Sequence, residues 1–203
     1  MNTVQRLKVK IFADDSSAID LPAFIPVFHR WIQEQTTDEL LLDVADYKHV
    51  QDGPGLLLMG HEADYAIDFA YGRAGLLYTH KRGWADAEDA DALAELSFQK
   101  RVESALRSAL RASAALAWDE TLDAPPSFQW HQVELSFPDR LRTPNRPETY
   151  AAMHDDLQAT AMRLYGGEAN VQRIENDQRA ALRVQIQTTQ PVDSGTLLDR
   201  LVS

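Results

Sequence analysis

Hydrophobic and polar residues alternate at the start of the chain. Leu7, Val9 and Ile11 are separated by Lys8 and Lys10. A period of two places the apolar side chains on one face of a β-strand and the charged ones on the other. We therefore expect a strand over residues 6–13, with one buried face and one solvated face.

After residue 20 the apolar residues recur every three or four positions, a spacing that is typical of an amphipathic helix. Pro22 suits the first turn of a helix and Asp20 suits its N-cap, so we expect a helix from Leu21 to about Gln35. Its apolar stripe consists of Phe24, Val27, Phe28, Trp31 and Ile32.

Four further strands are expected between this helix and residue 80. Residues 40–45 and 56–59 are apolar at consecutive positions, which indicates strands covered on both faces. The turn residues Asp52-Gly53-Pro54-Gly55 separate them. Alternation resumes over residues 64–70, and residues 75–78 follow a turn at Gly72. We expect these four strands to form an antiparallel meander.

A long helix is predicted from Asp86 to Leu116. Its ridge of Phe98, Val102, Leu106 and Leu110 is flanked by alanines, and such small side chains allow another element to approach closely. Lys100, Arg101, Arg107 and Arg111 follow the acidic start of this helix, so their charges complement the helix dipole without an external partner. The prolines at 125 and 126 end this part of the chain.

The second half of the chain shows a related order of elements. Strands are expected over residues 131–137, 169–174 and 180–188, with helices over 150–164 and 194–202. Each half opens with a charged and apolar strand that ends in Asp, VKIFAD and VELSFPD. We therefore predict an α+β fold with mostly antiparallel sheet, flanking helices and a pseudo-duplicated βαββ unit. The halves, residues 1–118 and 127–203, are expected to form one compact domain.

Composition narrows the classes of function. The net charge of −11 opposes binding to nucleic acid. No apolar run approaches the ~20 residues that span a bilayer, and the N-terminus lacks the apolar block of a signal peptide. The chain contains no Cys, which excludes disulfides, thiolate nucleophiles and Cys-ligated metals. We expect a cytoplasmic protein without a membrane partner.

The histidines and carboxylates of residues 43–82 suggest one candidate site. In an antiparallel meander, His49 lies about 15 Å from His61, at the other end of strands with ~3.3 Å per residue. A divalent metal site could then use His61, Glu62 or Asp64, and His80, because imidazole and carboxylate suit Zn, Mn or Fe. No other cofactor is indicated.

An alternative topology has residues 56–71 as one long strand. That register would place Asp46 opposite His61, and the pair, supported by Glu62, would provide a general base. Separately, Gly53 and Gly55 could present backbone N–H groups to an anion, with Arg73 adding positive charge.

The two functional hypotheses belong to different classes. The first is a non-enzymatic binding or assembly protein that associates with itself or with a protein partner. It is favoured by the long Ala-rich helix, by Trp84 and Trp118 at its ends, and by the absence of GxSxG, GxGxxG and phosphate-loop motifs. The alternative is a metal-dependent or general-base hydrolase or isomerase that binds a small molecule within residues 43–82.

Overall fold

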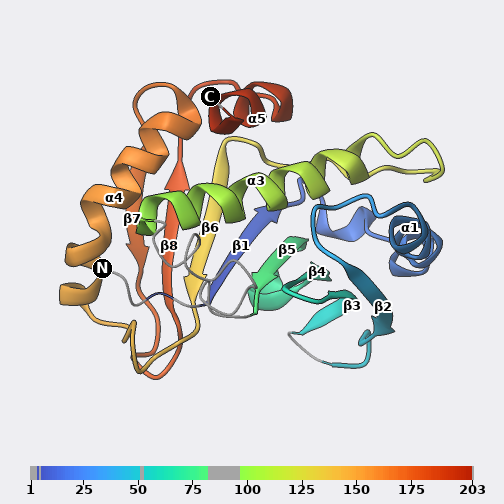
Figure 1. The fold of residues 1–203 in the computed structure, drawn as a ribbon, viewed down its shortest axis with the longest axis horizontal. Helices are drawn as coiled ribbons and strands as arrows, with labels where there is room; N and C mark the ends of the chain where they lie inside the picture. The colour runs from blue at the N-terminus through green and yellow to red at the C-terminus, as the bar shows by residue number, and fades with distance from the viewer. Residues whose placement is uncertain (1–3, 5, 51–52, 82–96, 203) are drawn as a thin grey trace.

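The alternating segment at the start of the chain forms β1 (Leu7–Phe12), which lies in the middle of one eight-stranded sheet (Figure 1). The computed structural model describes residues 4, 6–50, 53–81 and 97–202. All strand pairs are antiparallel, in the order β2-β3-β4-β5-β1-β6-β8-β7. The other strands are β2 (Leu41–Asp46), β3 (Pro54–Gly60), β4 (Ala63–Asp68), β5 (Gly75–His80), β6 (Gln132–Phe137), β7 (Asn170–Ile174) and β8 (Leu182–Gln187).

The predicted α+β class is confirmed, and so is the meander of four strands after the first helix. The alternative with residues 56–71 as one strand is wrong, because β3 and β4 are separate strands of a hairpin that turns at His61 and Glu62. The two halves share one sheet and meet where β1 pairs with β6. In each half the last strand, β5 or β8, returns to lie beside the first.

The described α-helices cover one face of this sheet. Helix α1 (Leu21–Glu34) packs on β2 and β3, α3 (Phe98–Ala117) crosses β1 and β5, and α4 (Pro147–Tyr165) packs on β7 and β8 (Figure 1). Helix α5 (Ser194–Val202) lies against α3 and α4. The first eleven residues predicted for the long helix, 86–96, lie outside the described residues, as does Trp84.

The hydrophobic core lies between the helices and the strand positions of one phase. Val9 of β1, Tyr78 of β5 and Leu135 of β6 are neighbours across the sheet and are buried beneath α3. The alanines of α3 at 105, 109 and 112 are also buried. Their small side chains let α3 lie close to the sheet of its own chain, so this stripe is not an association surface.

The remaining side chains of the strands point to the opposite face, which no described α-helix covers; we call it the helix-free face. One row of side chains crosses the middle of this face and contains one residue from each of the eight strands. A second row lies two residues further along each strand. The first row is Ala45, Leu57, Ala66, Leu77, Lys10, Glu134, Gln185 and Gln172, and the second is Asp43, Met59, Asp64, Thr79, Lys8, Ser136, Arg183 and Ile174.

The prediction that residues 40–45 and 56–59 are covered on both faces is wrong for β2. This strand is the outermost in the sheet, and Leu42 is 54% exposed. Leu57 and Met59 of β3 are half-buried on the helix-free face. Continuous apolar runs therefore mark this edge of the sheet rather than its centre.

Within the part of the chain that the structure describes, no helix combines the length and the apolar character needed to cross a membrane.

Candidate functional site

The turn between β3 and β4 carries the predicted metal ligands. His61 and Glu62 are exposed; the His61 N–H donates to the Leu40 carbonyl at 2.8 Å, and the Glu62 carbonyl accepts from the Lys81 N–H at 2.9 Å. His80 lies at the same end of the sheet, where it pairs with Ala63. The predicted residues therefore belong to one end of the meander.

The faces of the strands separate these ligands. His80 shares the side of Ala63 that faces the core and is buried, whereas Asp64 is the next residue along and projects from the helix-free face. The Asp64 carboxylate pairs with Lys81 at 2.9 Å. Among residues 4, 6–50, 53–81 and 97–202, no three His, Asp or Glu side chains are grouped closely enough to hold a metal ion.

Asp46 does not lie opposite His61. The register places Asp46 across from Leu56, at the far end of the β2–β3 hairpin, while Gly60 next to His61 pairs with Leu41. The Asp46 carboxylate accepts a hydrogen bond from the Lys48 N–H at 2.9 Å, and this bond lowers the pKa of Asp46. The predicted Asp46–His61 pair is wrong because it depended on the one-strand topology.

The predicted anion site is not assembled either. The Gly53 N–H donates to the Val50 carbonyl within the turn, and the Gly55 carbonyl accepts from the Tyr47 N–H at 3.0 Å. The Arg73 guanidinium lies 3.5 Å from the centre of the Phe12 ring on β1. Arg73 is therefore directed across the sheet, away from the glycine turn of β3.

Two buried ion pairs occupy the centre of the helix-free face. Lys10 is only 5% exposed, and its ammonium group donates to Asp68, itself 3% exposed, at 2.5 Å. On the neighbouring strands, Arg183 donates two hydrogen bonds of 2.7 Å to the buried Glu134 carboxylate. Burial lowers the pKa of Lys10, while the charge of Asp68 acts in the opposite direction.

These ion pairs fix the loop that contains Tyr71. The Asp68 carboxylate accepts a hydrogen bond from the Ala70 N–H at 3.2 Å, and Lys10 donates to the Ala70 carbonyl at 3.3 Å. The Arg183 guanidinium lies 3.8 Å from the centre of the Tyr71 ring. Tyr71 has φ 61° and ψ 27°, a left-handed conformation that disfavours bulky side chains. The residue is nevertheless 65% exposed.

An outlier of this kind is informative about function. A strained, exposed aromatic residue persists only where its surroundings over-determine its conformation, and such residues cluster at functional sites. Tyr and Arg are also, with Trp, the residues enriched among those that dominate binding at protein interfaces. Tyr71 and the nearby exposed Arg73 thus form the candidate contact point of the helix-free face.

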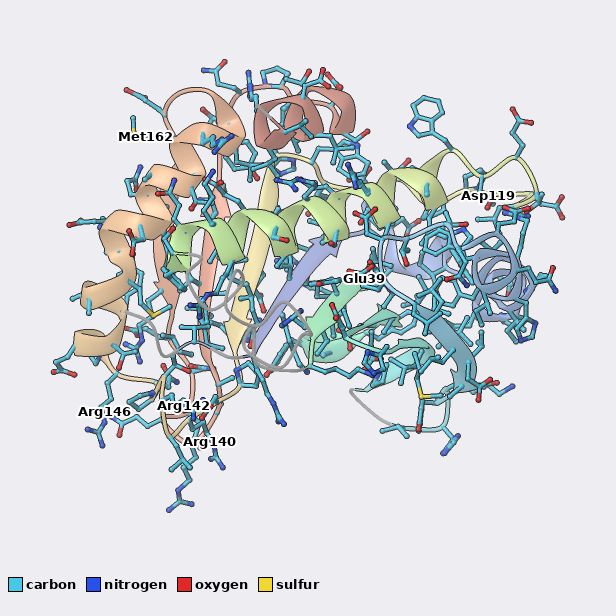
Figure 2. All side chains as sticks on the ribbon, in the orientation of Figure 1. Glu39, Asp119, Arg140, Arg142, Arg146 and Met162 are labelled. Carbon is cyan, nitrogen blue, oxygen red and sulfur yellow. The ribbon has the colours of Figure 1, made fainter. Side chains whose placement is uncertain are left out.

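A separate cluster of hydroxyl groups lies on the helical side of the sheet. The Tyr65 hydroxyl donates to the Glu39 carboxylate at 2.5 Å, and the Tyr65 and Tyr78 rings lie edge to face at 5.3 Å. Burial raises the pKa of both tyrosines, and the nearby Glu39 charge raises them further. Figure 2 shows Glu39 between α3 and the strands of the first half.

Arginines gather at the loop that follows β6. Arg140, Arg142 and Arg146 lie near one another at the end of the sheet below α4 and point outward (Figure 2). The loop is held by Asp139, whose carboxylate accepts from the N–H groups of Leu141 and Arg142. It is a local basic patch in an acidic chain.

The basic residues of α3, by contrast, have partners within the chain. Lys100 pairs with Glu103 and Arg111 with Asp38, and Arg107 donates to the Leu201 carbonyl. Arg101 donates to the Val4 carbonyl at 3.0 Å. This agrees with the interpretation that these charges require no external ligand.

Comparisons of the chain with family models, with curated proteins and with solved structures each gave no match. The class that the structure defines is an α+β protein with a single eight-stranded antiparallel sheet and helices on one face. Its function must be inferred from the geometry.

Tyr65, Tyr71 and Tyr78 lie within residues 43–82, but the sequence analysis overlooked all three because it searched for histidines. One signal was available: Lys10 and Asp68 occur within otherwise buried strands, where a charge requires a partner. The residues that complete each cluster, Glu39 and Arg183, come from distant segments and had no local signal.

Proposed function

We propose that this chain is a non-enzymatic binding protein that associates through its helix-free face, and that its partner is a second copy of the chain. The observation that carries the proposal is Tyr71, held exposed in a left-handed conformation by buried ion pairs. Buried ion pairs cost desolvation energy, and their best-attested use is to specify geometry rather than to add stability. Here they orient one aromatic side chain toward solvent.

The surface around Tyr71 has suitable chemistry. The sheet face measures roughly 700 Å² from eight strands about 4.8 Å apart and ~20 Å long, and because Lys10, Asp68 and Glu134 are buried at its centre, the flanking strands provide the accessible part. Half-buried Leu57, Met59 and Leu77 lie on one part of the face. Twisted sheets of this kind pack face to face in sandwiches.

The charge distribution favours a second copy. A chain with a net charge of −11 repels itself on most approaches. On the described part of the helix-free face, however, cations and anions nearly cancel, so two copies can approach there without strong repulsion. The cations are Lys8, Lys10, Arg73, Lys81 and Arg183, and the anions are Asp43, Asp64, Asp68 and Glu134.

Sedimentation velocity of the full chain over a wide concentration range tests the proposal. We expect a reversible dimer for the wild type. Leu77→Glu adds a charge to the middle of the face and should weaken the dimer about tenfold or more. Leu141→Glu is the matched control, since Leu141 is 96% exposed in the loop after β6; this variant should dimerise as the wild type does.

A third variant isolates Tyr71. Asn tolerates the left-handed conformation better than Tyr does, so Tyr71→Asn should weaken the dimer while it preserves the unfolding midpoint in urea. A wild-type chain that stays monomeric at every concentration would overturn the proposal. So would equal effects of Leu77→Glu and Leu141→Glu on the dimer.

A further inference from the structure

A cavity of about 320 Å³ lies on the opposite side of the sheet from the helix-free face, between α1, α3 and β4. This volume is at the lower end of the range for small-molecule sites. Trp31 of α1 and Tyr65 of β4 contribute aromatic rings, and Ala112 and Ala115 of α3 leave the space open. The remaining lining residues are Thr36, Thr37, Asp38, Ser108 and Arg111.

The cavity is polar at one end because hydroxyl groups from several elements converge on it. The Tyr65 hydroxyl, which lines the cavity, donates a hydrogen bond to the Glu39 carboxylate, so this carboxylate lies directly behind Tyr65. Ser108 contributes a hydroxyl from α3, and Thr36 and Thr37 contribute two from the loop before β2. Placed polar groups beside aromatic and small apolar side chains are a common pattern of a ligand site.

The charges around this cavity favour a cation. Asp38 and Arg111 line the cavity and pair with each other at 2.7 Å, so the remaining charge nearby is the Glu39 carboxylate, one hydrogen bond beyond Tyr65. The raised pKa of Tyr65 keeps its phenol neutral. An anionic ligand would have to compete with Asp38 for Arg111 and would be repelled by Glu39. A cation gains from Glu39 and from the aromatic wall of Trp31.

We propose that this cavity binds a small organic ammonium ion, with Glu39 as its counter-charge and Trp31 as its aromatic wall. Tyr65 is assigned as the lining residue that meets the ammonium group, and Glu39 as the counter-charge held behind it. The Arg111–Asp38 pair, whose two side chains are both exposed, closes the outer end of the cavity between α3 and the loop before β2. This inference is independent of the association proposed for the other face.

Three probes of nearly equal size and different charge test the proposal: benzylamine, benzyl alcohol and benzoate. Each is titrated into the full chain and followed by isothermal calorimetry and by amide chemical shifts. Benzylamine should bind with a Kd of about 1 mM or tighter, as a small ligand of this size allows. The alcohol should bind about tenfold more weakly, and benzoate should not bind.

Variants locate the site. Glu39→Gln keeps an acceptor for the Tyr65 hydroxyl and removes the negative charge. The loss of this counter-charge should weaken benzylamine binding about tenfold. Glu120→Gln makes the same change at an exposed position and should have no effect. Ala115→Phe should abolish binding of benzylamine by filling the cavity, with amide shifts showing that the fold persists.

Benzoate binding as tightly as benzylamine would overturn the proposal, because the site would then not select for positive charge. Equal effects of Glu39→Gln and Glu120→Gln would also overturn it. If benzylamine causes no shift in amides near Trp31, Ser108 or Ala112, the cavity is not the site.

Discussion

At the scale of single residues, the sheet contains buried charged side chains near its centre. Lys10 and Asp68 are both almost fully buried, yet each has its partner within hydrogen-bonding distance. Such a pair contributes little net stability compared with apolar residues of the same shape, but removing one partner leaves an uncompensated buried charge. The pair is therefore sensitive to single substitutions and tolerant of double ones.

Asp68→Ala should lower the free energy of unfolding by about 3–5 kcal/mol, because it leaves Lys10 buried without its counter-charge. Urea unfolding followed by circular dichroism measures this loss. Lys48→Ala is the control, since the Lys48–Asp46 pair is exposed and such pairs are worth about 0–1 kcal/mol. A loss in Asp68→Ala no larger than in Lys48→Ala would contradict the assignment of a buried pair.

The stability of Asp68→Ala should also depend on pH in a defined direction. Burial lowers the pKa of Lys10 in the folded wild type, and loss of the Asp68 charge should lower it further. Between this lowered pKa and the ordinary lysine pKa of about 10.4, the unfolded chain binds more protons than the folded one. The stability of Asp68→Ala should therefore increase as pH rises through that window, and this increase should begin at a lower pH than in the wild type.

At the scale of elements, close approach of neighbouring strands limits side-chain size where β5 begins. Gly75 pairs with Phe12 at the end of β1, and a Cβ atom at Gly75 would lie 2.2 Å from the Ile11 carbonyl oxygen. That oxygen belongs to the backbone of the central strand. It cannot move aside without disturbing the pairing on which the meander and β6 both depend.

Gly75→Ala should therefore destabilise the fold by about 1–3 kcal/mol, the usual cost of an overpacked site. Gly167→Ala is the matched control, because no atom lies within 4 Å of the added Cβ and the backbone has no left-handed conformation there. That substitution should be neutral or stabilise by about 0.4–1 kcal/mol. Thermal unfolding compares the two variants, and equal melting temperatures would show that β5 can shift away from β1.

At the scale of the whole molecule, the net charge of −11 opposes association at every distance within the screening length. An interface between neutral faces contains few ion pairs that salt could weaken. Raising the NaCl concentration should therefore screen the repulsion and lower the Kd of the proposed dimer. Sedimentation velocity at low and high salt measures the change.

The opposite salt dependence would identify a different interface. If the Kd rises with salt, ion pairs hold the two copies together. The arginine loop with Arg140, Arg142 and Arg146 would then be the surface to test against the acidic remainder of the chain. A Kd that does not change with salt would contradict the role assigned to the net charge.

Local patterns in the sequence predicted most elements with small errors at their ends. The alternation of Leu7, Val9 and Ile11 identified β1, and the turn at Gly53 separated β2 from β3, because both signals depend on residues close together in the chain. The candidate sites were less predictable. Asp46 and His61 were paired on a register that only the hairpin at His61 and Glu62 could decide.

The sequence by itself therefore determined most elements, the α+β class and the buried phase of the alternating strands such as β1 and β8, since periodicity is a local property of the chain. Only the tertiary structure decided which side chains meet. Strand order places Lys10 beside Asp68 and Arg183 beside Tyr71, and packing of α1 and α3 encloses the cavity lined by Tyr65. These contacts join segments far apart in the chain, so no local pattern records them.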